Sequence, residues 1–195
     1  NWTRKGSYLR GVIDKWGIDK NIGKGRIYRL VHKDHKPGPQ PKMLKESTKE
    51  LVAHLSHPNG WWRDTAQKLL ILKGDKSVGP SLLEKATNGK THLERVHALW
   101  TLEGLMLADE KIIRKAMADE NPHVRAAAIR VSESLFKAAN DSLANDIKNM
   151  TKDKNGEVVL QALMTAKHLG LEEWQEWLVN AREENESRAV QELAS

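Results

Sequence analysis

The chain has 195 residues, no cysteine and a formal net charge of +6. Without cysteine, these residues cannot form a disulfide, a thiolate metal site, a covalent c-type haem or a cysteine nucleophile. No apolar run approaches the ~18 residues of a membrane-spanning helix, and no signal peptide is recognisable. Because the chain begins with Asn rather than Met, we expect a processed product or a piece of a longer protein.

The positive charge is concentrated near the start of the chain. Residues 1–45 hold 12 Lys or Arg and 3 Asp, whereas the remaining residues hold 20 basic and 23 acidic side chains. This asymmetry predicts two structural regimes. The mildly acidic body argues against a surface that follows a phosphate backbone, so we do not expect nucleic acid as the partner.

Residues 1–40 are predicted to be irregular or β, with little helix. They contain six of the 13 glycines, a density that disfavours a long helix. RIYRLV, residues 26–31, is rich in β-branched and aromatic side chains and predicts a strand. YLRGVI, residues 8–13, is a weaker candidate for a strand or a turn of helix. HKDHKPGPQPK, residues 32–42, reads as an extended, proline-rich linker.

Residues 41–195 show an internal repeat. An arginine three residues before an alanine recurs at spacings of 32 and 30 residues, and a fourth unit follows 34 residues later with valine in place of arginine. An incomplete fifth unit begins near Trp174. The paired positions are Arg63 and Ala66, Arg95 and Ala98, Arg125 and Ala128, and Val159 and Ala162.

A good helix N-cap residue stands four positions before the first residue of each pair: Asn59, Thr91, Asn121 and Asn155. Thr91 is followed by Glu94, the pattern of a capping box. Each unit is therefore predicted to form a helix, a turn and a second helix. The first helices are expected at 46–56, 77–87, 109–118, 142–152 and 172–182. A ~30-residue helical period is typical of a stacked α-solenoid, so we predict an all-α, right-handed solenoid of about 4–5 hairpins.

Two units, HPNGWWRDTAQKLLILKG and DENPHVRAAAIRVSESL, resemble HEAT repeats. GKGRIYRLVHKD followed by LVAHLSHPNGWWRDTAQKLL is similar to bacterial proteins described as membrane-bound dehydrogenases. In those proteins a glucose/sorbosone-dehydrogenase-like β-propeller runs into HEAT repeats and then a c-type cytochrome domain. NWTRKGSYLRGVIDKWGIDKNIGKGRIYRL resembles the end of the last propeller blade.

The resemblance implies an oxidoreductase for a parent protein that uses haem c and a quinone, in the periplasm or cell envelope. No Cys-x-x-Cys-His motif is present here, and only a closing fragment of a blade is. We therefore expect neither catalysis nor a cofactor or metal site in this segment. Its expected role is that of a scaffold that contacts the adjacent propeller and cytochrome c domains, or another protein.

The candidate site residues fall into two groups. Arg63, Arg95 and Arg125 are expected to bond to turn carbonyls or to acids of a neighbouring repeat, although a phosphate-binding stripe is the alternative. The second group comprises candidates for contact with neighbouring domains: Trp61, Asp64, Tyr28, Trp174 and Trp177. Trp62 is expected in the repeat core and Trp61 at its edge. Trp174 and Trp177 also read as the core of the last repeat.

Two rival functions come from other classes. One is a nucleic-acid-binding protein of the HEAT-like DNA glycosylase type, which uses Trp and Asp in a basic groove. The other is a HEAT-like chromophore lyase or a similar enzyme, which needs a polar cleft with a perturbed acid. His54 and His57 could share a metal ion, but dipole complementation at a helix end is the stronger explanation.

Overall fold

The computed structural model describes residues 4, 6–21, 23, 25, 30–34, 36, 38–136 and 142–193. The chain divides into two compact units, Asn1–Gln40 and Pro41–Ser195. All regular structure in the described residues is helical. These residues thus have an all-α fold.

The first unit contains the helix α1 (Tyr8–Trp16) and the 3-10 turn η1 (Ile18–Asn21). Ser7 caps the start of α1 by accepting from the Arg10 amide at 3.2 Å, and Gly17 ends it in the left-handed region at φ 60°. Of the two structures expected for residues 8–13, the strand was therefore wrong and the helix is present. Glycine density misled because five of those six glycines lie outside α1, and Gly17 ends the helix rather than disrupting it.

The strand expected at residues 26–31 falls largely on residues 26–29, which lie outside the described residues. Leu30 and Val31 are described and belong to no strand. The residue Tyr28, a docking candidate, lies outside the described residues as well.

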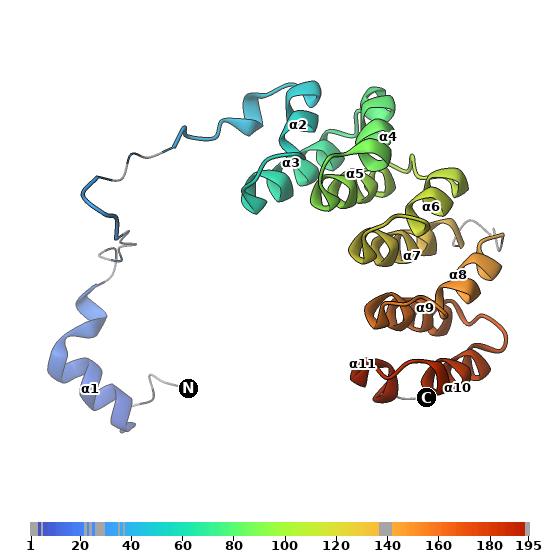
Figure 1. The fold of residues 1–195 in the computed structure, drawn as a ribbon. Helices are drawn as coiled ribbons and strands as arrows, with labels where there is room; N and C mark the ends of the chain where they lie inside the picture. Colours follow the sequence, from blue (N-terminus) through green and yellow to red (C-terminus); the bar gives the residue numbers. More distant parts are fainter. Residues whose placement is uncertain are drawn as a thin grey trace. The chain divides into compact units, whose positions relative to one another are not determined.

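The second unit is a row of helix pairs (Figure 1). In the figure α3, α5, α7 and α9 form the inner layer of this row, and α2, α4, α6, α8 and α10 form the outer layer. The elements are η2 (Met43–Lys45), α2 (Thr48–His54), α3 (Gly60–Lys73), η3 (Lys76–Val78), α4 (Gly79–Asn88), α5 (His92–Gly104), α6 (Glu110–Met117), α7 (Pro122–Phe136), α8 (Ala144–Met150), α9 (Gly156–Leu169), α10 (Trp174–Glu184) and α11 (Arg188–Gln191).

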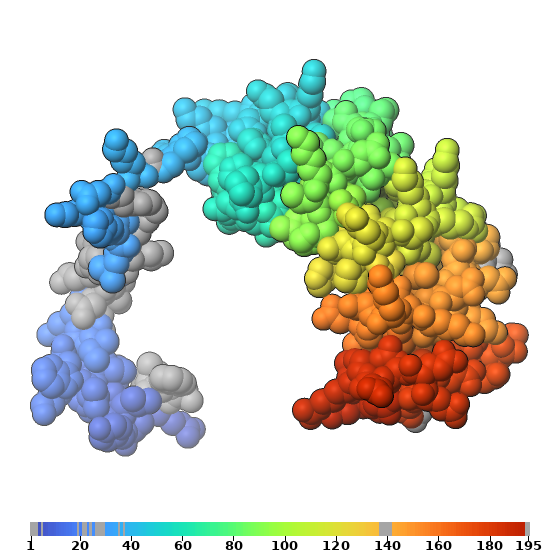
Figure 2. Space-filling model, viewed as in Figure 1, coloured from blue at the N-terminus to red at the C-terminus, as the bar shows by residue number. Residues whose placement is uncertain are grey.

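The inner helices pack in series: α3 contacts α5, α5 contacts α7, and α7 contacts α9. The same order appears in the space-filling view, where successive helix pairs follow one another along the row (Figure 2). The core therefore runs through the row as a continuous cluster of apolar side chains between the layers. The four repeat alanines are all fully buried in it, and they are Ala66, Ala98, Ala128 and Ala162.

The starts of the inner helices are fixed by short polar side chains. Asn59, Thr91 and Asn155 cap α3, α5 and α9, and the Asn121 side chain accepts from the His123 amide at 3.0 Å at the start of α7. Each side-chain oxygen satisfies an amide that has no partner inside the helix. These caps set the position along the chain at which each inner helix begins.

The capping box expected at Thr91 is only half formed. Thr91 accepts from the Glu94 amide at 3.1 Å, but the Glu94 carboxylate accepts from the Lys90 amide instead of that of Thr91. A complete capping box is found at the start of α2, between Ser47 and Glu50. Glu94 departs from the pattern because Ser56 and Lys85, on the neighbouring helix pair and on α4, compete for its oxygens.

Candidate interaction surface

Three buried arginines hold the turns that begin the inner helices. Arg63 Nη1 donates to the carbonyls of His57 and Pro58 at 2.7 and 3.0 Å. Arg95 Nη1 donates to the Gly89 carbonyl at 2.8 Å. Carbonyls in these turns have no partner within the helices, so a guanidinium satisfies groups that burial would otherwise leave unpaired.

Arg125 repeats this contact and adds a second. Its Nη1 donates to the carbonyls of Asp119 and Glu120 at 2.9 and 3.0 Å. Its Nε and Nη2 donate to the two carboxylate oxygens of Asp153 at 2.7 and 2.8 Å. Asp153 lies in the turn before α9, so this bidentate pair joins two successive helix pairs.

Arg95 makes the equivalent link one unit earlier. Its Nη2 donates to Asp119 Oδ1 at 3.0 Å, and its Nε lies 2.8 Å from Asp119 Oδ2. Arg63 has no such partner, because the position equivalent to Asp119 in the next turn is Gly89. Among the described residues, the buried Nε of Arg63 has no hydrogen-bond acceptor. The arginines are thus occupied inside the protein and form no exposed phosphate-binding stripe.

The Asp153 carboxylate gives a pH-dependent prediction. Burial alone would raise its pKa, but hydrogen bonds from Arg125 and from the Asn155 amide lower it below its ordinary value. Because the folded state favours the ionised carboxylate, Asp153 stabilises the protein at pH values above its pKa in the unfolded chain. This stabilisation is lost as the pH falls through the pKa of Asp153 in the folded protein. We therefore expect Asp153→Asn to be less stable than the wild type at pH 7. The difference in the free energy of unfolding between the two proteins, measured by urea titration, should narrow as the pH is lowered from about 5 to about 3.

A constant or widening difference over that range would contradict the assignment. Glu94, whose carboxylate also titrates in acid, is unchanged in both proteins and so cancels in the comparison. Burial would raise the Glu94 pKa, but hydrogen bonds from Lys85 and Ser56 lower it.

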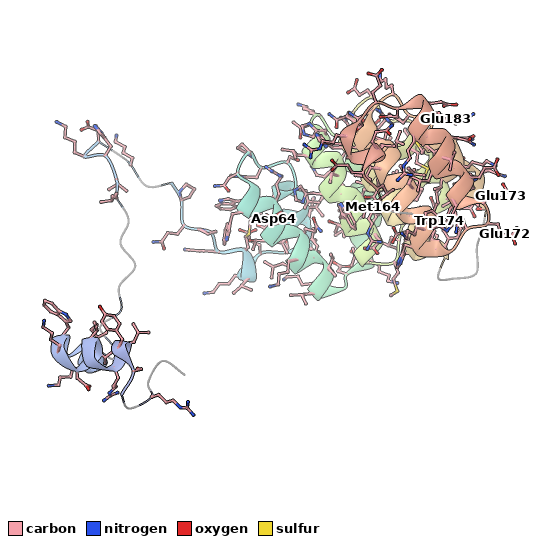
Figure 3. The ribbon with its side chains drawn as sticks, turned by 90° about the horizontal axis from the view of Figure 1, so that it is seen from below. Asp64, Met164, Glu172, Glu173, Trp174 and Glu183 are labelled. Carbon is pink, nitrogen blue, oxygen red and sulfur yellow. The ribbon has the colours of Figure 1, made fainter. Side chains whose placement is uncertain are left out.

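The exposed side of the inner layer carries an apolar strip. The strip occupies two equivalent positions on each of α5, α7 and α9, and one of the six positions, on α7, is the exposed Arg130. We define the strip as the five apolar side chains: Val96, Trp100, Ala126, Leu160 and Met164. Four of them are half-buried, and Met164 is 50% exposed. Figure 3 labels Met164 on α9 and Asp64 on α3, the helix that precedes the strip.

Asp64 and its neighbours border this strip. Asp64 is exposed, and its Oδ1 lies 3.8 Å from Nε2 of His97 on α5. The His97 ring also contacts Gln67 Oε1 through Nδ1 at 2.8 Å. Burial, followed by the charge of Arg63, lowers the pKa of His97, while Asp64 opposes the shift. His97 is therefore held as a link between α3 and α5 beside the strip.

The two adjacent tryptophans have different environments. Trp62 packs partly buried against the core and stacks on His57, with ring centroids 4.8 Å apart and planes 17° apart. Trp61 is 54% exposed and meets Trp62 edge to face at 6.2 Å. Trp61 thus presents an aromatic surface at the first helix pair, on α3.

His54 and His57 are used in packing contacts. His54 Nε2 lies 2.7 Å from Glu46 Oε2, and the His57 Nδ1 accepts from the Asn59 amide at 3.0 Å. In the described part of the chain, no group of three or more His, Cys, Asp or Glu side chains is placed to hold a metal ion. Nor do the described residues include a helix long and apolar enough to cross a membrane.

Trp177 and Trp174 lie on α10. Trp177 is buried, with its Nε1 unpaired among the described residues and the Lys148 ammonium 5.3 Å from its ring centroid. Trp174 is half-buried, and Lys167 lies 5.0 Å from its ring. Figure 3 shows Trp174 near Glu172 and Glu173, where α10 begins. Trp177 is thus a core residue, and only Trp174 offers an accessible ring face.

A groove between α2 and α4 was not anticipated. It has a volume of about 970 Å³, with Val52, Ala53, Val78 and Pro80 among its lining residues. The Glu94 carboxylate at one end accepts hydrogen bonds from Ser56 Oγ and Lys85 Nζ, both at 2.6 Å. Sequence reasoning missed the groove because the contacts join residues 29 and 38 positions apart.

No family model matches the chain, and a search of curated proteins also finds no match. The function proposed below is therefore argued from the repeat pattern, the arginine contacts and the apolar strip.

Proposed function

We propose that this chain is a HEAT-type helical scaffold that binds neighbouring protein domains and performs no catalysis of its own. The observation that carries this proposal is the apolar strip, which lies on three successive inner helices, is only partly covered, and is interrupted on α7 by Arg130. In a solenoid the core of each hairpin is covered by the next one along the stack, so apolar side chains left on the inner layer are available to a partner.

The period and the polar contacts support the HEAT-type assignment. In four helix pairs the inner helix starts at an equivalent cap, and in three of them the arginine one turn into that helix bonds to its own turn. Arg95 and Arg125 then reach the turn of the following pair. This pattern gives a rigid spacer whose pairs are fixed to their neighbours.

The resemblance to propeller–HEAT–cytochrome c proteins supplies the proposed partners. The propeller would meet the first helix pair at Trp61 and Asp64, and the c-type cytochrome domain would meet the apolar strip. Haem c and quinone would then belong to those domains of the parent protein. Sugar or alcohol oxidation would require the longer protein, and the scaffold would set the spacing between its redox domains.

The test is a binding titration between the purified chain and the c-type cytochrome domain that we propose as its partner in the parent protein. We expect Met164→Glu to weaken binding at least about tenfold, because a carboxylate would be desolvated in the apolar strip. Leu83→Glu is the matched control. Leu83 is 39% exposed on α4, in the outer layer, and should leave affinity within about twofold.

Equal losses in both variants, or no binding by the wild type, would count against this assignment. Oxidation of a sugar or alcohol by the chain alone, measured with an electron-accepting dye, would overturn the non-catalytic role.

A further inference from the structure

The helix α1 has an apolar face that the described residues of its own unit leave partly or largely exposed. Tyr8, Leu9, Val12, Ile13 and Trp16 are spaced so that they lie on one side of a helix. All nine residues of α1 are described, and none is buried. Tyr8 is 86% exposed and Trp16 is 71% exposed. An exposed aromatic side chain therefore stands at each end of this apolar face.

The other side of α1 carries charged side chains and Gly11. Arg10 and Asp14 form an ion pair at 3.1 Å one helical turn apart. The Lys15 ammonium lies 5.7 Å from the ring centroid of Trp16, beside the apolar face. With Ser7 and Gly17 as caps, the helix has defined ends and two chemically distinct sides.

The surrounding charge distinguishes between possible partners. The first 40 residues contain ten Lys or Arg and three Asp. A second copy of this segment would carry the same excess of positive charge and be repelled. A neighbouring protein domain could cover an apolar face without any need for that charge. An anionic lipid surface satisfies both features, because it accepts aromatic and aliphatic side chains at the headgroup level and attracts Lys and Arg.

We propose that α1 binds peripherally to anionic lipid bilayers. The helix lies in the plane of the interface with Val12 and Ile13 directed toward the acyl chains and with Tyr8 and Trp16 at the headgroup boundary. Arg10, Lys15 and the other cations of the segment face the lipid phosphates. The contact is reversible, since a nine-residue helix buries little apolar area. This inference concerns the first unit alone and is independent of the scaffold function proposed above.

The test is co-sedimentation of the full chain with vesicles of phosphatidylcholine containing about 30% phosphatidylserine, compared with pure phosphatidylcholine. We expect binding to the anionic vesicles that weakens as salt is added. Trp16→Gln should lower the partition coefficient about tenfold, because it removes the largest interfacial side chain. Gly11→Gln is the matched control on the polar side, where a new Cβ meets no atom within 4 Å. It introduces the same residue and should change partitioning less than about twofold.

Circular dichroism of both variants checks that the second unit stays folded. No binding to anionic vesicles by the wild type would overturn the proposal, as would equal binding to neutral vesicles. Equal loss in Trp16→Gln and Gly11→Gln would also overturn it, since the apolar face would then be irrelevant. Binding to a protein partner that is lost in Trp16→Gln, with no vesicle binding, would assign the face to a protein domain instead.

Discussion

Replacing Arg125 by alanine is expected to lower the free energy of unfolding by about 3–5 kcal/mol. The substitution removes both guanidinium hydrogen bonds to the Asp153 carboxylate and leaves that largely buried charge with the Asn155 amide as a donor but no cation paired with it. It also frees the carbonyls of Asp119 and Glu120 in the turn before α7. Breaking one side of a buried pair is costly because the remaining ion has already lost its water. Urea denaturation followed by circular dichroism measures the change.

Arg114→Ala is the matched control for this prediction. Arg114 also forms ion pairs, with Glu110 at 2.8 Å and Asp146 at 2.9 Å, but its side chain is 43% exposed. Water can replace its contacts, so the loss should be much smaller than that of Arg125→Ala. Similar losses in the two variants would show that Arg125 does not link the helix pairs in the way its geometry indicates.

Replacing Gly89 by alanine is expected to destabilise the protein by about 2–3 kcal/mol. A Cβ atom at this position would stand 2.4 Å from the Lys85 carbonyl oxygen and 2.9 Å from Glu94 Cγ. The backbone oxygen cannot move without disturbing the end of α4. The Gly89 carbonyl also accepts from Arg95, so any shift of the turn weakens that contact. Thermal denaturation should show a clear fall in the midpoint temperature.

Gly60→Ala provides the comparison, because Gly60 also stands in a turn region between paired helices. Its nearest neighbour for a new Cβ is the flexible Arg63 Nη2 at 3.4 Å, and it lies at the first position of α3, where alanine is favourable. We expect a change of less than about 0.5 kcal/mol in either direction. A larger loss for Gly60→Ala than for Gly89→Ala would refute the steric explanation.

The helical character of residues 41–195 could be predicted because its signals are local. Caps such as Asn59 and Asn155 act within a few residues of their own position, and the buried repeat alanines recur once in each of four helix pairs. The first helices, for example α4 and α6, also lie inside or close to the expected ranges. Local capping chemistry and periodic burial are encoded in a short window of sequence.

The partners of buried polar groups could not be predicted in the same way. Glu94 follows a local pattern, yet its carboxylate is taken by Ser56 and Lys85 from other elements. Glu133 is likewise buried and accepts from Thr165 Oγ1 on α9 at 2.7 Å. Which of several competing groups wins such a contact depends on the packing of distant segments. The groove beside Glu94 could not be predicted for the same reason.

The error at residues 8–13 arose from composition. The glycine count was taken over 40 residues and so combined α1 with the segments on either side of it. Ser7 and Gly17 mark the two ends of α1, and the apolar residues between them have a helical spacing. A window limited to residues 7–17 would have favoured the helix. Local capping signals therefore deserve precedence over regional composition in a short element.

The arginine–aspartate links between helix pairs run in one direction only. The second pair contributes a donor, Arg95, and the third contributes both an acceptor, Asp119, and a donor, Arg125. The fourth contributes the acceptor Asp153 but has Val159 where a donor would stand. Only the third pair therefore carries both the acceptor and the donor of such a link. Duplicating it would lengthen the array with every junction satisfied, whereas duplicating the second or the fourth would leave one junction lacking half of its connection.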